Sequence, residues 1–217
     1  MGYHKRLKIQ SDWGYPVLSD AERVEFLAET TEYLSRFFTQ PEVTFEGKHI
    51  VAKNAPGAPF VNRKPRFLIG GGRASVLKIA ARHADLWDGL AIWTYGAGKG
   101  EEIGEYYRRK EAVLVEECRA IGRDPAEITR CLTAYAAVAT SVEEAEAIAA
   151  ERTPYIPDRP QIVGTPDTAV AFLLAAYRLG VRDIQIVPVT RGGNEALLQL
   201  IATNGRDVAP ALRAALK

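Results

Sequence analysis

Short apolar runs alternate with helix-forming segments through most of this sequence, and that alternation restricts the fold more than any other feature. Segments with apolar residues at helical spacing separate the apolar runs. Strands that are apolar on both faces and joined by helices are typical of a parallel sheet covered by helices. The sequence therefore predicts an α/β fold with four parallel strands, at residues 66–69, 85–93, 128–140 and 183–189.

The expected helices begin and end at residues that favour helix termini. Ser19, followed three residues later by Glu22, predicts a capping box at the start of a first helix, which Pro41 stops. Gly122 and Gly180 are typical residues just beyond a helix C-terminus. The later helices are expected from Val76 to His83, from Glu105 to Ile121, from Ser141 onward, and from Thr165 to Leu179.

The remaining segments contain turn-forming residues or weaker periodicity. Val43–Phe45 and His49–Val51 flank Gly47 and predict a small hairpin. Prolines or the absence of periodicity indicate loops, and the chain ends in helical segments. We expect loops at Met1–Tyr15, Asn54–Asn62 and Thr153–Val163, and helical segments at Asn194–Ala202 and Val208–Leu216.

Charge and composition argue against several classes of protein. Lys and Arg number 28 and Asp and Glu 27, so the formal net charge of +1 over 217 residues argues against nucleic acid as a partner. No stretch approaches the roughly 20 consecutive apolar residues of a membrane span. Residues 1–10 lack the apolar core of a signal peptide, so we expect a cytoplasmic protein without a membrane partner. Cys118 and Cys131 are too few for a disulfide scaffold, although a bridge between them is possible.

The strongest candidate for a binding site is the loop Gly70, Gly71, Gly72 and Arg73, between a predicted strand and a predicted helix. Glycines let a ligand approach the backbone, and the free N–H groups of a helix start favour an anion such as a phosphate. Arg73 could add a planar pair of donors. The alternative is a tight turn that needs glycine only for its backbone angles. On the residues alone, both interpretations stay open.

Asp88 and Gly89 form a second candidate, with Asp85 and Trp87 just before them. Two carboxylates beside an aromatic ring could carry out acid–base chemistry, but carboxylates in turns more often cap the backbone. None of the three histidines has metal-ligand spacing to another ligand, and no metal site is expected. Gly122–Pro125 is interpreted as a structural turn.

Longer stretches of the sequence resemble the luciferase-like monooxygenase family. Residues 66–89, RFLIGGGRASVLKIAARHADLWDG, and residues 117–128, ECRAIGRDPAEI, carry most of the resemblance. The segment Gly164–Pro166 resembles the region before that family's last barrel strand, and Val43–Gly47 resembles the hairpin that the family inserts in mid-barrel. The resemblance extends over nearly the whole chain.

The resemblance implies an oxidoreductase that moves a hydride between a small organic substrate and a flavin-type cofactor, on a (βα)8 TIM-type barrel. The deazaflavin coenzyme F-420 is favoured over FMN, because the style of Gly122–Pro125 is more similar to the deazaflavin-dependent branch. Gly70–Arg73 would then lie at the cofactor phosphate, and Asp88 and Gly89 on the ring side. The resemblance assigns no catalytic residue to this chain.

The four predicted strands correspond only to the C-terminal half of such a barrel. We therefore expect residues 1–217 to form one domain, an incomplete barrel that is truncated on its N-terminal side relative to the family. Such a sheet has two open edges and one apolar face without helices, which predicts a homo-oligomer or a partner that completes the barrel. A non-catalytic flavin-binding or assembly protein, or an inactive fragment, is the alternative to an enzyme.

Overall fold

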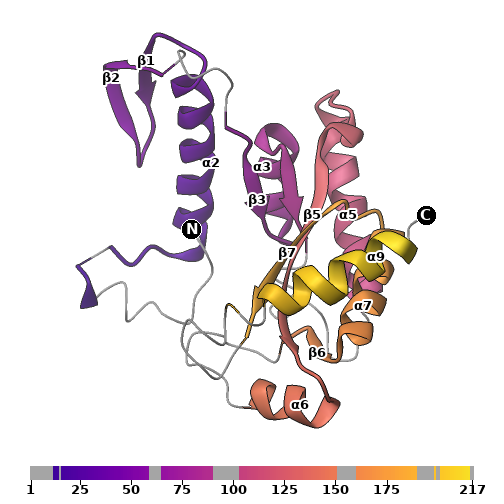
Figure 1. Ribbon diagram of the computed structural model, residues 1–217. Coiled ribbons are helices and arrows are strands. Elements are labelled where there is room, and N and C mark those ends of the chain that lie inside the picture. The colour runs from indigo at the N-terminus through magenta and orange to yellow at the C-terminus, as the bar shows by residue number, and fades with distance from the viewer. Residues whose placement is uncertain are drawn as a thin grey trace.

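A computed structural model gives the fold, and it describes residues 12–14, 16–58, 65–89, 103–150, 160–189, 198 and 201–215. Its centre is a parallel sheet with helices packed on one face (Figure 1). The described strands of this sheet are β3 (Leu68–Gly70), β4 (Leu86–Asp88), β5 (Thr129–Val138), β6 (Ile162–Gly164) and β7 (Asp183–Pro188). The helices that follow them are α3 (Ala74–His83), α5 (Ile103–Ala120), α6 (Val142–Ala150), α7 (Pro166–Arg178) and α9 (Ala209–Ala215).

The predicted α/β class and the four predicted strands are confirmed. The sheet does not close into a barrel in the part of the chain that the structure describes, as a partial barrel requires. The expected loop Thr153–Val163 was wrong at its end, because Ile162 and Val163 belong to β6, which pairs with the end of β5. The strand expected at 85–93 is shorter where it is described, and residues 90–102 lie outside the described part.

Strand β5 organises the sheet because both of its edges are paired. The backbone N–H and C=O groups of its even-numbered residues point toward β7. The bonds from the Arg182 N–H to the Arg130 carbonyl and from the Val189 N–H to the Ala136 carbonyl show this. Its other edge is shared by β4, opposite residues 129–131, and β6, opposite residues 136–138. Residues 133 and 135 therefore lie on that edge where β4 has ended and β6 has not begun.

Two side chains fill this gap in the hydrogen-bond ladder. The Asp88 carboxylate accepts a bond from the Thr133 N–H at 3.3 Å, and the Gln161 amide oxygen accepts one from the Tyr135 N–H at 2.7 Å. Because an unpaired buried N–H is costly, these two side chains let β5 continue unbroken between its two short neighbours.

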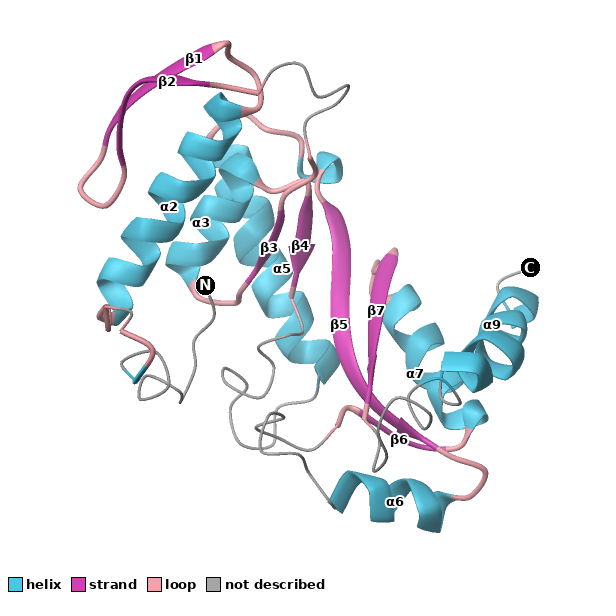
Figure 2. Cartoon of the chain, turned by 60° about the vertical axis from the view of Figure 1, so that its left-hand side comes forward, coloured by secondary structure: helices cyan, strands magenta, loops and turns pink. Residues whose placement is uncertain are grey.

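One face of the sheet forms the core. The side chains of Trp87, Leu132, Ala134 and Ile184 pack there with apolar residues of α3, α5 and α7. Figure 2 shows α3 and α5 beside β3 and β4, and α7 and α9 beside β7. Cys118 and Cys131 are both buried and free, so the possible disulfide between them does not form.

The opposite face, called here the interior face because it would line a closed barrel, differs from the expectation. Sequence reasoning predicts an apolar surface, and Leu68 and Val187 belong to it. However, Asp88, Thr133 and Gln185 form a polar row across three neighbouring strands on this face. The polar row reduces the apolar area that a partner would have to cover.

Helix α2 (Asp20–Phe37) carries the hairpin of β1 (Glu42–Glu46) and β2 (Val51–Pro56) away from the sheet (Figure 1). The predicted capping box is present: the Ser19 hydroxyl accepts from the Glu22 N–H, and the Glu22 carboxylate accepts from the Ser19 N–H. The second hairpin strand was placed too early, because β2 pairs with β1 as far as Pro56 opposite Glu42 and so includes part of the expected loop 54–62.

A single carboxylate ties the hairpin turn to α2. Glu29 accepts bonds from the backbone N–H groups of Lys48, His49 and Ile50 at 2.8 to 2.9 Å. Beside it, Glu25 pairs with the Lys48 ammonium at 2.8 Å and lies 3.2 Å from the His49 ring. Burial disfavours the ionised form of Glu29, but the three N–H donors outweigh burial and lower the pKa of the carboxyl below 4.5.

At the N-terminal ends of the strands, two arginine side chains donate hydrogen bonds to backbone carbonyls. Arg123 donates to the carbonyls of Ala81 and Ala84 at 2.9 and 2.8 Å, which joins the end of α3 to the turn after α5. Arg182 donates to the carbonyls of Tyr177 and Val181, both at 2.9 Å. The positive φ of Gly122, +72°, confirms the interpretation of residues 122–125 as a structural turn.

The helical segments at the C-terminus are continuous where the sequence predicts a break. The break expected between the last two helical segments is instead a five-residue π-helical turn, Asn204–Val208, that leads directly into α9. Most of the segment expected at 194–202 lies outside the described residues, as does most of the loop expected at 1–15. No helix among the described residues is long and apolar enough to cross a membrane.

We expect the hairpin to detach from α2 on acidification. A carboxyl whose pKa is lowered by folding stabilises the folded state at pH values above its unfolded pKa, and this contribution is lost as the pH falls through its folded pKa. The contribution of Glu29 should therefore disappear below about pH 4.5. The protection factors of the amides of residues 48–50 against hydrogen exchange should therefore fall there, and in Glu29→Gln they should already be low at pH 7. Glu46→Gln, on the same hairpin, is the control; equal protection in both variants would contradict this role.

Removal of the Arg123 guanidinium should destabilise the whole sheet. Arg123→Ala leaves the Ala81 and Ala84 carbonyls without these donors, and we expect a loss of about 1.5–3 kcal/mol in the free energy of unfolding in urea. Arg123→Lys cannot reproduce a planar pair of donors and should recover little of it. Arg119→Ala, an exposed neighbour, should change stability by less than about 0.5 kcal/mol. Similar values for Arg123→Ala and Arg119→Ala would contradict the clamp.

Candidate functional site

The loop Gly70–Arg73 connects the end of β3 to the start of α3, as the sequence predicts. Gly71 has φ of +153°, which only glycine adopts readily. Its N–H donates to the Asp88 carbonyl at 3.2 Å, and its carbonyl accepts from the Trp87 indole N–H at 2.8 Å. The loop is therefore fixed against β4 by bonds on both sides of Gly71.

Gly72 is required for a different reason. A Cβ at this position would lie 2.4 Å from the hydroxyl oxygen of Tyr106, on α5. At Gly70, by contrast, the nearest atom to an added Cβ is 3.7 Å away, on Asp88. The structure thus gives Gly71 a conformational role and Gly72 a packing role, whereas Gly70 has room for a side chain.

The start of α3 lacks an acceptor of its own. Arg73 occupies the N-cap position and makes no side-chain cap bond, because a guanidinium cannot accept a hydrogen bond. No acidic residue lies in the first turn of α3. The positive end of the helix dipole and the N–H groups of exposed Ala74 and Ser75 therefore suit an external anion. Arg73 itself pairs with Asp20 of α2 at 2.7 Å, a partner that sequence reasoning missed.

Helix α5 adds positive charge beside the loop. The guanidinium of Arg109 and the ammonium of Lys110 lie 5.4 and 5.5 Å from the centre of the Tyr106 ring. The Lys110 side chain also comes within 3.5 Å of the position a Cβ on Gly72 would occupy. Sequence reasoning missed these residues; the run Tyr106–Lys110, which is aromatic and basic, was the available signal.

Asp88 and Gly89 lie next to the loop, at the end of β4. The Asp88 side chain is only 3% exposed, and both of its oxygens bond to Thr133, to the hydroxyl at 2.6 Å and to the N–H at 3.3 Å. Gly89 is buried, and a Cβ there would lie 2.7 Å from the Trp87 ring. The structure therefore brings both residues next to the loop and gives each a structural role.

Two further groups near Asp88 are kept neutral by their surroundings. Burial, together with the Asp88 and Asp183 carboxylates, raises the pKa of the Cys131 thiol to about 12. Burial also raises the pKa of the Tyr107 hydroxyl, whose oxygen is buried without a hydrogen-bond partner in the structure. Neither group is an activated nucleophile at neutral pH.

The histidines and acids do not form a metal site in the described part of the chain. His83 is the last residue of α3, where a cation suits the helix dipole, and its Nε2 lies 3.7 Å from a Glu32 carboxylate oxygen. His49 packs against Phe26 and Glu25 at the hairpin. His4 lies outside the described residues.

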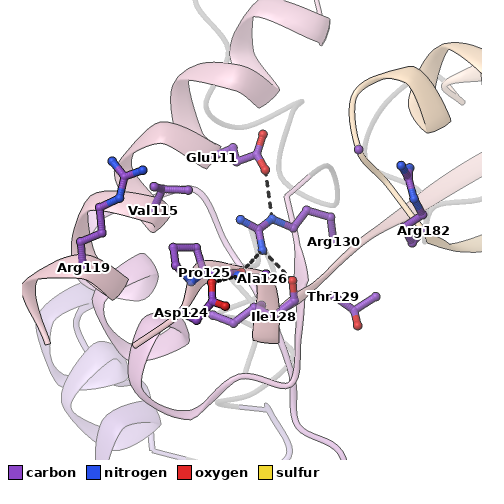
Figure 3. A pocket seen from close by; sticks show the side chains of 11 residues that line it. Glu111, Val115, Arg119, Asp124, Pro125, Ala126, Ile128, Thr129, Arg130 and Arg182 are labelled. Atoms are coloured by element: carbon purple, nitrogen blue, oxygen red, sulfur yellow. Dashed lines mark hydrogen bonds and ion pairs between the residues drawn. The ribbon is translucent and has the colours of Figure 1, made fainter. Parts of the chain in front are cut away.

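A groove of about 570 Å3 opens at the N-terminal ends of the strands, away from the glycine loop. It lies between α5 and the start of β7 (Figure 3). Its arginines are largely occupied: Arg130 pairs with Glu111 at 3.0 Å and donates to backbone carbonyls, and Arg182 caps the end of α7. Because the N-terminal face of βα barrels generally serves stability, this groove is a weaker candidate than the glycine loop.

Substitution tests the packing of the loop against α5. Gly72→Ala should destabilise the protein by about 1–3 kcal/mol, because the new methyl group overlaps the Tyr106 hydroxyl. The second substitution Tyr106→Phe should restore much of that loss, and Gly70→Ala should be tolerated. Urea unfolding of the four proteins measures this coupling; additive effects of the two substitutions would show that Tyr106 does not set the requirement for glycine.

The chain is similar to known proteins both in sequence profile and in fold. Residues 8–178 match the sequence profile of a protein family described as luciferase-like monooxygenase. No curated protein sequence matches the chain. Several solved structures have similar folds at low sequence identity.

The fold is similar to that of monooxygenase RslO1 from Streptomyces bottropensis, with a TM-score of 0.67, 16% identity, and coverage of 94% of this chain and 65% of that one. It is also similar to a coenzyme F-420-dependent tetrahydromethanopterin reductase from Methanopyrus kandleri (TM-score 0.62, 14% identity, 87% and 63% coverage). A riboflavin lyase solved with a modified FMN and riboflavin gives a TM-score of 0.64 at 12% identity, with 95% and 60% coverage. The chain therefore spans less than two thirds of the length of these proteins.

Proposed function

Because the chain belongs to the luciferase-like monooxygenase family, we propose that it binds a flavin-type cofactor and takes part in hydride transfer with a small organic substrate. The main support for this proposal is that α3 begins at the loop Gly70–Arg73 without a side-chain cap. The cofactor, when bound, supplies the redox chemistry, and the protein supplies binding and orientation.

The phosphate of the cofactor would lie at the start of α3. The first-turn N–H groups and the helix dipole favour an anion there, and Ala74 and Ser75 of that turn are exposed. Arg73 and Lys110 provide positive charge on two sides. Asp88 and Gly89, at the end of the adjacent strand, would flank the ring side of the same ligand.

We favour coenzyme F-420 over FMN, on the sequence of residues 122–125. Proteins of similar fold include a coenzyme F-420-dependent reductase and an enzyme solved with a modified FMN, so both cofactors are chemically reasonable. Both carry a phosphate group, and the proposed contacts at α3 are the same for either.

A non-catalytic flavin-binding or assembly role is the second candidate. It is favoured by the sheet, which does not close into a barrel among the described strands. In that case residues 1–217 form one partial-barrel domain whose edges at β3 and β7 pair with a second copy or with a complementary half-barrel.

Titration with FMN and with coenzyme F-420 tests cofactor binding. Gly71→Asp should abolish binding of either, because it places a carboxylate at the phosphate position and a Cβ at a φ of +153°. Gly205→Asp, where an added Cβ meets nothing within 4 Å, is the control. Unchanged affinity in a folded Gly71→Asp variant would show that the phosphate does not bind at this loop.

A second variant tests the same site in the opposite direction. Asp20→Asn removes the carboxylate that pairs with Arg73, so the guanidinium becomes available to the phosphate. We expect FMN to bind about two- to fivefold more tightly, the range for releasing an exposed ion pair. Glu46→Gln, which also removes one exposed carboxylate, corrects for the change in net charge. Equal affinity of Asp20→Asn and Glu46→Gln would show that Arg73 does not contact the phosphate.

A further inference from the structure

The groove at the N-terminal ends of the strands carries more positive charge than its own carboxylates neutralise. Three arginines line it against two carboxylates, and they come from the last turn of α5 (Arg119), from β5 (Arg130) and from the turn before β7 (Arg182). Figure 3 shows Arg130 between the other two arginines in this view. Both carboxylates have partners within the chain: Glu111 accepts from Arg130 at 3.0 Å, and Asp124 accepts from a backbone N–H of its own turn at 2.9 Å. The surplus positive charge favours an anion from outside the chain.

Arg182 presents two donors on one edge of its guanidinium. Its Nη1 donates to the carbonyls of Tyr177 and Val181, both at 2.9 Å, and its guanidinium carbon lies 4.1 Å from the centre of the Tyr177 ring. Among the described residues, none accepts from its Nε or Nη2. These two nitrogens share one edge of the planar group, so their parallel N–H bonds fit the two oxygens of a carboxylate. Because Nη1 is already held, this pair of donors is ordered before a ligand binds.

Arg130 lies opposite Arg182, where β5 and β7 begin. The Arg182 N–H donates to the Arg130 carbonyl at 2.9 Å, and the next residues along, Cys131 and Asp183, are paired in the sheet. The Arg130 side chain is only 11% exposed, and its Nε and Nη1 bond to Glu111 and to two backbone carbonyls. Its Nη2 has no acceptor in the part of the chain that the structure describes. Two neighbouring positive charges repel each other, and an anion beside them reduces that repulsion.

The uncharged part of the groove is mostly apolar. Its walls include Val115, Pro125, Ala126 and Ile128. An inorganic anion buries none of this apolar surface, whereas an organic anion with an apolar body does. The volume of about 570 Å3 also lies within the range of roughly 300–1,000 Å3 that is typical of small-molecule sites. The groove therefore suits a ligand with a carboxylate at one end and an apolar body at the other.

We propose that this groove binds a small organic carboxylate, with the carboxylate on the edge of Arg182 formed by Nε and Nη2. Arg119 and Arg130 supply further positive charge, and the apolar body packs against the apolar wall. The groove opens at the opposite end of the strands from the loop Gly70–Arg73, so it is a second site. The inference therefore goes beyond the proposed function and does not depend on it.

Three probes separate the two parts of such a ligand. 3-Phenylpropanoate has a carboxylate and an apolar body, 3-phenylpropanamide has the same body without the charge, and acetate has the charge without the body. In titrations followed by backbone amide shifts, 3-phenylpropanoate should bind about tenfold more tightly than either of the others. The shifts should occur at residues 126–130 and 180–182. Equal affinity for either of the other probes, or shifts at residues 71–75 instead, would overturn the proposal.

Variants of two arginines test the contacts. Arg182→Lys keeps the charge but has no pair of parallel donors, and it should weaken 3-phenylpropanoate binding about tenfold. Arg119→Ala removes an exposed charge that makes no hydrogen bond with a described residue, and it should weaken binding about two- to fivefold. Arg108→Ala, at an exposed arginine of the same helix outside the groove, is the control.

Urea unfolding checks that each variant is folded, because Arg182 also bonds to the end of α7. Should Arg182→Lys fail to fold, the comparison of Arg119→Ala with Arg108→Ala decides. Wild-type affinity in a folded Arg182→Lys, or equal affinity of Arg119→Ala and Arg108→Ala, would overturn the proposal.

Gly71→Asp separates this inference from the proposed function. It alters the glycine loop and leaves the groove intact, so it should bind 3-phenylpropanoate as the wild type does. Weaker binding of this probe by a folded Gly71→Asp variant would place the probe at the loop and overturn the inference. A wild type that does not bind FMN, but still shows 3-phenylpropanoate shifts at residues 126–130 and 180–182, would contradict the proposed function and support the groove.

Discussion

The continuity of β5 is the constraint on which the rest of the structure depends. This ten-residue strand has far shorter neighbours on one edge, β4 and β6, which together leave two N–H groups without a backbone partner. Asp88 and Gln161 supply the missing acceptors from their side chains. Because Asp88 must reach Thr133 to do so, its carboxylate is placed on the interior face beside the glycine loop. One requirement of the sheet thus positions a polar side chain next to the loop Gly70–Arg73.

The two ends of the sheet are specialised in different ways. At the C-terminal end, the N-terminus of α3 has no side-chain cap and is bordered by basic residues of α5. At the N-terminal end, arginines satisfy the carbonyls at the ends of helices and turns. Backbone groups are therefore capped by the protein's own side chains at the end that serves stability, and remain available at the end where a ligand would bind.

Much of the fold could be predicted from local sequence, because its determinants are local. The capping box at Ser19, the helix stop at Gly122 and the apolar strands all act within a few residues. The strand β6 was missed because three residues give no periodicity, and the strand exists only through its pairing with β5. The interior face was predicted as apolar because a pattern of residues does not show which polar side chains meet across strands.

The candidate site was predictable in position but not in detail. The loop Gly70–Arg73 follows a strand and precedes a helix, and sequence is sufficient to place it there. The reasons for each glycine depend on contacts with distant residues: Gly72 on Tyr106, and Gly71 on bonds to Trp87 and Asp88. The pairing of Arg73 with Asp20 joins residues 53 positions apart, which no local pattern reveals.

Backbone amide chemical shifts test the proposed phosphate site at the start of α3 most directly. On addition of FMN to the isotopically labelled chain, we predict that the largest shifts occur at the amides of residues 71–75, and that inorganic phosphate moves the same amides in the same direction. Shifts that instead concentrate at the groove of Arg119, Arg130 and Arg182, with the amides of residues 71–75 unmoved, would contradict the account.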